Sequence, residues 1–297
     1  MSAVPLSAAK EANKLTKILD IFHQAHGGFR YPVNVKELAL QCAELFAWDD
    51  PISEVKPANI PGFDGGLFKD LDTKKWLLLY NQSVESLGRI RFTQAHELGH
   101  YILHRQAKES FQCTEEDMLN WDIEEKNIES QADKFAANLL MPLHDFREQV
   151  TNTVDLDVLG VCADRYGVSL TASILRWLEH TDQKAVVIHS RDGYMNWSWS
   201  SQAAFKAGAF FRTKRAPVPI PEGSLAANGV IKLEKAGQRV PARIWFEHAE
   251  EITQLREMKV SSDRHRHDIV ISLLILPQSA DVWKVRSPEW FTRSPNG

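Results

Sequence analysis

The chain has 297 residues, of which 43% are hydrophobic and 25% are charged, and its net charge is −4. The length is sufficient for two or three modules that each bury a core, and the net charge excludes a global basic field of the kind that attracts nucleic acid. No apolar run reaches about 18 residues, so we expect no membrane span. The cysteines are odd in number and form no CxxC pair, which favours a reducing cytoplasm over a disulfide framework: Cys42, Cys113 and Cys162.

Hydrophobic periodicity predicts two helices near the N-terminus, over residues 8–25 and 34–47, the second behind the N-cap Asn34. Lysines interrupt the apolar pattern of the first segment, so it resembles an amphipathic helix and not a signal peptide. Clusters of Pro, Gly and Asp between short apolar runs predict turns and strands over 55–83. The clearest of these strands is KKWLLLYN at 74–81.

The middle of the chain returns to a helical pattern. A second helical zone starts near Thr93, and the segment 128–142 predicts another helix that stops at its final proline. Residues 106–127, between the two, are acidic and predict an irregular connector. Two short helices around a turn at Gly167 are predicted over 155–180.

Beyond residue 182 the pattern changes to that of strands. Residues 184–200 predict a hairpin with its turn at Asp192-Gly193, and 242–249 and 268–277 predict further strands. The changes in pattern place domain boundaries near residues 150 and 182.

The motif His96-Glu97-Leu98-Gly99-His100 lies inside the second helical zone. Positions i and i+4 share a helix face, so His96 and His100 can direct two imidazoles at one ion, and Glu97 can reach water bound to it. A catalytic zinc takes three protein ligands and lowers the pKa of its water to about 7, where a carboxylate can remove the proton. The alternative is that the two histidines share a helix without a metal.

A third ligand is available from the predicted helix that follows. Glu129 and Asp133 again have i, i+4 spacing, so Glu129 can complete the ligand set and Asp133 can orient an imidazole by a hydrogen bond. Glu124 and Glu125 are weaker candidates, because they lie in the irregular stretch and lack a carboxylate four residues on.

His104 lies eight residues after His96, about 12 Å along a helix axis, so we expect a structural or surface histidine and not a ligand. A zinc peptidase also needs a donor that stabilises the tetrahedral intermediate. The sequence leaves four candidates open for that role: Tyr80, Tyr101, His104 and His144.

Two segments together resemble the ImmA/IrrE family of metallopeptidases: RIRFTQAHELGHYILH at 89–104 and IESQADKFAANLLMP at 128–142. Both match the family pattern closely and in the family order. The resemblance implies a zincin-like peptidase domain in a cytoplasmic protease. It also implies that the substrate is a repressor of the XRE helix-turn-helix type, whose cleavage relieves repression of stress genes or of a mobile element.

By the same resemblance, His96, His100 and Glu129 are the zinc ligands and Glu97 is the general base, with manganese as the alternative ion. A peptide substrate can add as a strand to an exposed sheet edge, and we expect residues 76–81 to provide that edge. The acidic residues 109–125 are either a lid or, as we favour, a solvated connector.

Residues 159–180 resemble a helix-turn-helix unit, in which Arg165 and Arg176 are the only arginines and are offset by Asp164 and Glu179. A surface that grips phosphates carries more positive charge, so we favour a helical brace over a DNA-reading unit. The segment that follows resembles a mixed α/β domain, and some members of the family carry a GAF-like sensor at this place.

We therefore expect an α+β protein with three parts: a zinc metallopeptidase domain at 1–147, a helix-turn-helix-like unit at 148–181 and an α/β, GAF-like domain at 182–297. The predicted function is that of a zinc-dependent endopeptidase. The alternative is a DNA-binding or ligand-sensing regulator whose peptidase-like domain is not catalytic. Glu97 favours the enzyme, because a structural zinc site has no need of a base.

Overall fold

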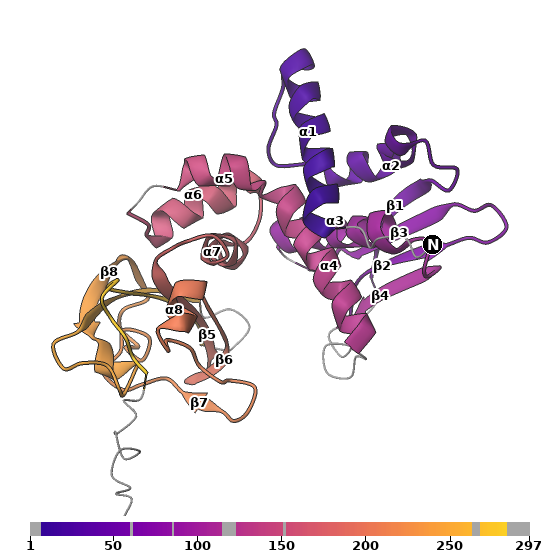
Figure 1. Cartoon of the computed structure of the whole chain (residues 1–297). Helices are drawn as coiled ribbons and strands as arrows, with labels where there is room; N and C mark the ends of the chain where they lie inside the picture. The colour runs from indigo at the N-terminus through magenta and orange to yellow at the C-terminus, as the bar shows by residue number, and fades with distance from the viewer. Residues whose placement is uncertain are drawn as a thin grey trace, which may run out of the picture. The chain divides into compact units, whose positions relative to one another are not determined.

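The computed structural model describes residues 7–59, 62–84, 86–114, 123–150, 153–262 and 268–283. The chain divides into two compact units, of which the first contains residues 1–154 and 158–173 and the second contains 155–157 and 174–297. Helices and strands occur in both, so the protein is α+β as predicted, and Figure 1 shows the elements in chain order. The further division into helix-turn-helix-like and GAF-like parts stays a prediction.

The helices near the N-terminus agree with the predicted ranges. They are α1 (Ala8–His26) and α2 (Val35–Phe46), and the Asn34 side chain accepts a hydrogen bond from the Glu37 N–H at 3.2 Å. Helix α3 (Leu87–His104) begins six residues before the predicted Thr93. It does so because the Ser86 hydroxyl caps it, accepting from the Arg89 N–H at 3.2 Å.

The remaining helices of the central region follow in close succession. They are α4 (Ile123–Leu140), α5 (Leu143–Gln149), α6 (Leu156–Tyr166) and α7 (Leu170–Leu178). Among the described residues no single helix is long and apolar enough to cross a membrane. Helices α6 and α7 reach that length and apolarity only as a pair, which bends by 109°.

The first unit contains a four-stranded sheet in the order β1-β3-β2-β4. Strands β1 and β3 are parallel, and β2 is antiparallel to both β3 and β4. The strands are β1 (Ile52–Ala58), β2 (Phe63–Lys69), β3 (Trp76–Asn81) and β4 (Ser110–Thr114).

This order corrects two predictions. Residues 76–81 do not offer an edge, because β3 lies between β1 and β2. The edge strand β4 and the start of α4 both fall inside residues 106–127, which were predicted to be irregular. A polar strand that pairs on one side only has no continuous apolar signal, so periodicity misses it. Residues 115–122 lie outside the described part of the chain.

Helix α3 packs closely against α4 on one side and contacts the sheet through β3 on the other. A Cβ added to Gly99 would lie 3.0 Å from Cδ1 of Phe135 and 3.3 Å from the Cα of Ala132. Trp76 of β3 and Tyr101 of α3 are both fully buried, with ring centroids 6.0 Å apart. The glycine of the motif therefore lets the two helices pack nearly backbone to backbone.

The second unit contains a six-stranded antiparallel sheet in the order β7-β6-β5-β10-β9-β8. Its strands are β5 (Lys184–Arg191), β6 (Tyr194–Ser200), β7 (Val218–Pro219), β8 (Leu233–Pro241), β9 (Gln254–Ser262) and β10 (Ile269–Leu276). The predicted hairpin is confirmed, since Asp192 (φ 51°) and Gly193 (φ 82°) form the left-handed turn between β5 and β6.

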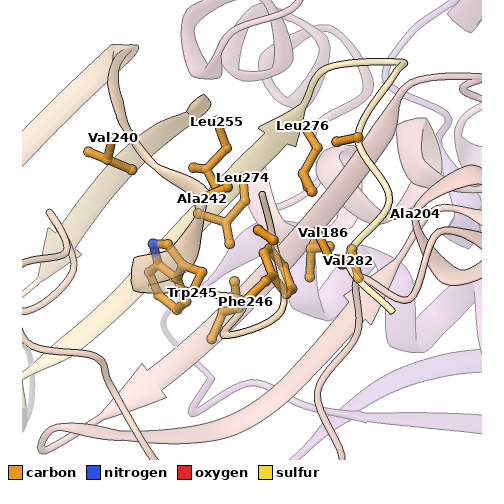
Figure 2. Packing of buried hydrophobic residues seen from close by; sticks show 14 of the residues in the cluster. Val186, Ala204, Val240, Ala242, Trp245, Phe246, Leu255, Leu274, Leu276 and Val282 are labelled. Carbon is orange, nitrogen blue, oxygen red and sulfur yellow. The ribbon is translucent and has the colours of Figure 1, made fainter. Parts of the chain in front are cut away.

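The core of this unit lies against one face of the sheet, as Figure 2 shows for a cluster that includes Val186, Leu274, Trp245 and Phe246. The strand predicted over 242–249 is wrong. Ala242–Ile244 form a short 3₁₀ helix, and the adjacent Trp245 and Phe246 are both buried. Neighbouring residues on a strand point to opposite faces, so an irregular segment is needed to direct both rings into one core.

Candidate metal centre

The predicted ligands come together where α3 packs against α4. His96 and His100 are buried on α3, and Glu129 faces them from α4. The donor atoms of these three residues all lie within 4.8 Å of one another. The group could therefore hold a metal ion.

The spacing of the donor atoms fits such an ion. The two Nε2 atoms of His96 and His100 are 3.0 Å apart, and Glu129 oxygens lie 2.8 Å from the first and 3.3 Å from the second. Atoms that lie about 2.0–2.1 Å from one tetrahedral ion are roughly 3.3 Å from each other. Two imidazoles and one carboxylate form a donor set that catalytic zinc uses.

Asp133 lies where the sequence predicts it, one turn after Glu129. Its Oδ1 is 2.9 Å from Nδ1 of His96. With the proton on Nδ1, His96 donates to this carboxylate, and its Nε2 lone pair is directed at the position that it shares with His100 and Glu129.

His104 contacts Nδ1 of His100, as Asp133 contacts Nδ1 of His96. It is buried, with its Nδ1 3.2 Å from Nδ1 of His100 and its Nε2 3.5 Å from Oε1 of Gln131. The prediction that His104 is structural and not a ligand agrees with this position, but it does not lie at the surface. His104 lies four residues after His100 on the same helix, and this spacing could have predicted the contact.

We expect His104→Ala to weaken metal binding by roughly 10- to 100-fold, because His100 would lose the acceptor that fixes its tautomer. Competition with a chromogenic chelator measures this affinity. His104→Gln keeps an acceptor of similar reach and should recover part of the loss. An unchanged affinity in the alanine variant would show that His104 only fills space.

Phe111 of β4 covers the same imidazole. Its ring is stacked on His100, with centroids 4.5 Å apart and an interplanar angle of 18°. No sequence signal pointed to this residue, since it lies in the stretch predicted to be irregular. The contact places the edge strand β4 directly beside the metal-binding group.

The environment sets the protonation states that a metal requires. Burial lowers the pKa of His100 to about 4. Burial raises the pKa of Glu129, but hydrogen bonds from His100 and His96 outweigh it and hold that pKa well below the usual range of a carboxyl. At neutral pH the centre therefore offers a neutral imidazole and an ionised carboxylate.

Glu97 is fully buried one residue along α3 from His96. It packs under β2, where a Cβ added to Gly65 would lie 3.0 Å from Oε1 of Glu97 and 2.3 Å from Cγ2 of Thr93. Sequence reasoning missed Gly65, because only the pairing of β2 in the sheet brings it against α3.

Gly65→Ala should therefore displace Glu97 or Thr93 and lower the rate of the predicted peptide cleavage by roughly 100-fold, as a shift of about 1 Å at a reacting group does. Metal affinity should stay within a factor of about two, since no donor atom is touched. Cleavage assays and metal titration on one preparation would test both expectations. Gly66→Ala, one residue on, presses on Phe68 and the Phe111 carbonyl instead, and it controls for strain in β2.

Three of the four candidates for the intermediate-stabilising donor have other contacts. Tyr101 is buried and donates its hydroxyl to the Asp50 carbonyl at 2.8 Å, and His144 forms a 3.5 Å ion pair with Asp20. His104 contacts the far side of His100. Tyr80, the fourth, is the cross-strand partner of Gly65. Directly opposed residues share a face of a sheet, so Tyr80 projects on the face that meets α3.

The helix-turn-helix-like turn also packs on α3. A Cβ added to Gly88 would lie 2.8 Å from the carbonyl carbon of Val168, and the Arg91 guanidinium donates to the Gly167 carbonyl. Arg165, one of the two arginines of the unit, forms a bidentate pair with Asp145 at 2.8 Å. These contacts support the interpretation of the unit as a brace for the helix that carries both histidines.

Residues 55–178 match the peptidase M78 family model, which describes the IrrE N-terminal-like domain. The matched segment begins within β1 and ends with α7. It thus contains all of the sheet except the first residues of β1, both helices of the metal-binding group and the turn at Gly167. No match was found among curated proteins.

Proposed function

Because residues 55–178 match the model of the IrrE N-terminal-like domain, we propose that this chain is a zinc-dependent endopeptidase of the ImmA/IrrE family. One observation carries the proposal: the Nε2 atoms of His96 and His100 and the carboxylate of Glu129 converge beside the buried Glu97. Two imidazoles favour zinc over manganese, which prefers oxygen ligands. A structural site has no use for the adjacent carboxylate.

In this proposal His96, His100 and Glu129 would hold the ion. Bound zinc would acidify a water molecule and polarise the peptide carbonyl. Glu97 takes the proton of the attacking water and delivers it to the leaving amine. Asp133 and His104 keep the imidazoles in place, and Tyr80 is the candidate donor to the developing oxyanion.

The substrate would lie along β4. This strand pairs with β2 on one side, and among the described residues no strand pairs with its other side, which is an edge of the sheet. The stacking of Phe111 on His100 places that edge next to the candidate metal centre. A peptide that adds as a strand there would run past the metal ligands, with main-chain hydrogen bonds that hold its scissile bond in position.

We further propose that the substrate is a helix-turn-helix repressor of the XRE type, whose cleavage relieves repression. The support for this partner is the family resemblance of residues 89–104 and 128–142. Such a substrate is a protein, so an extended segment of it can pair with β4.

The deciding experiment mixes the purified protein, loaded with zinc or separately with manganese, with the repressor-like protein encoded beside its gene. Intact-mass spectrometry would detect a discrete metal-dependent cut, with the Glu97→Gln variant as the control. A cut that the control also makes would contradict the proposed mechanism. A bound ion without a cut on this or other extended peptide substrates would favour the non-catalytic regulator.

A further inference from the structure

The second unit carries a run of positive charge that the proposed peptidase does not use. Between Asp192 and Glu222 the sequence has no acidic residue but four basic ones: Lys206, Arg212, Lys214 and Arg215. All four are exposed, and none forms an ion pair with another residue of the described ranges. In a chain whose net charge is −4, this segment is a local concentration of positive charge.

Three aromatic rings contact one another beside two residues of this segment, Lys206 and Arg212. Phe210 is 5.0 Å from Phe205 and 5.7 Å from Trp283, measured between ring centroids. Phe205 is 56% exposed and Trp283 is 48% exposed. The guanidinium of Arg212 lies 5.6 Å from the centre of the Phe210 ring. We call these three rings and the four cations the aromatic–basic surface.

Hydrogen bonds fix the backbone beside the three rings. The Ser200 hydroxyl donates to the Ala209 carbonyl at 2.8 Å. This hydrogen bond links the segment after α8 (Gln202–Lys206) to β6. The indole N–H of Trp283 donates to the Lys206 carbonyl at 2.8 Å. The rings are therefore presented in a fixed arrangement, which lowers the entropy lost when a ligand binds.

A neighbouring aromatic ring packs against the core of the same unit, whereas these rings do not. Phe211, the next residue after Phe210, turns inward and stacks on Phe246 with centroids 5.3 Å apart. At Gly208 the chain adopts φ +83° and passes so close to Trp283 that an added Cβ would lie 2.9 Å from its ring. The fold thus packs the partly buried Phe211 against the core and leaves Phe205 and Trp283 about half exposed.

A ligand that suits the aromatic–basic surface must offer both negative charge and flat faces. An acidic peptide would use the cations but not the rings, and duplex DNA keeps its bases stacked inside the helix. Single-stranded nucleic acid offers phosphates for the cations and unstacked bases for the rings. We propose that the aromatic–basic surface of the second unit binds single-stranded nucleic acid with little sequence preference.

The test uses the full-length protein and a fluorescently labelled oligo-dT of about 15 nucleotides, with binding followed by anisotropy. If three or four cations contact phosphates, affinity should fall roughly 20- to 50-fold between about 50 and 200 mM salt. A duplex of the same length should bind more weakly at each salt concentration. Absence of binding at low salt would overturn the proposal.

A matched pair of charge variants locates the site. Arg212→Gln removes one charge from the aromatic–basic surface, and Arg239→Gln removes one from an exposed position on β8 of the same unit. Only the first should weaken binding and lower the salt slope by about 0.7. Equal effects of the two variants would mean that net charge, and not this surface, attracts the oligonucleotide.

A second pair tests the rings. Phe205→Leu keeps an exposed apolar side chain but removes the aromatic face, so binding should weaken roughly 5- to 100-fold, while Phe205→Trp should bind as the unmodified protein does. Phe205 is more than half exposed, so neither change should impair folding. If Phe205→Leu binds normally and poly-glutamate displaces the oligonucleotide, the surface is a docking site for an acidic protein segment and the proposal is wrong.

Discussion

Replacing Glu97 with glutamine should lower the rate of the proposed peptide cleavage by roughly 10²- to 10⁴-fold and leave metal binding intact. The amide fills the same buried space beside Gly65 but cannot accept the proton of the attacking water. Cleavage of the proposed repressor substrate, measured together with the metal content of the same sample, tests both parts of this expectation.

The matched control for this variant is Glu148→Gln, which removes one carboxylate from the described chain at an exposed position on α5. It should cleave at the normal rate. Full activity of Glu97→Gln would remove Glu97 from the mechanism and leave the metal-binding group without an assigned base. Loss of the metal in Glu97→Gln would show instead that Glu97 supports the ligands.

The second large effect is expected at the ligand that comes from α4. Glu129→Ala should lose more than about 100-fold in metal affinity, because it removes the only anionic donor of the three. Cleavage should be lost in proportion. Metal content after gel filtration and a chelator titration would measure the loss.

Asp133→Asn provides a graded comparison on the same helix. Its carboxylate contacts Nδ1 of His96 and not the shared donor position, so the loss of affinity should be about 10- to 100-fold, smaller than that of Glu129→Ala. Stoichiometric metal in Glu129→Ala would overturn the assignment of Glu129. A larger loss of metal affinity in Asp133→Asn than in Glu129→Ala would indicate that Asp133 is the ligand and Glu129 the supporting carboxylate.

The family match also bears on the extent of the first unit. The peptidase part was predicted to end at residue 147, whereas the family match continues to residue 178. The contacts of the Gly167 turn with α3 give a physical reason to treat α6 as part of the support for the metal-binding group. The boundary at 147 itself stays a prediction.

The sequence by itself predicted the residues that form the candidate metal-binding group. The i, i+4 spacing of His96 and His100, repeated by Glu129 and Asp133, is a local property of two helices, and it needs no knowledge of the fold to place each pair on one face. The helices themselves follow from apolar periodicity and caps such as Asn34, which also act over a few residues.

Only the tertiary structure decided how these helices are completed into a site. The place of β3 inside the sheet, the edge at β4 and the approach of Gly65 to Glu97 all depend on strand pairings between distant parts of the chain. The aromatic–basic surface arises in the same way, because Trp283 joins Phe210 across more than 70 residues of sequence. Local patterns carry no information about such pairings, since a strand's neighbours are selected by packing of the whole unit.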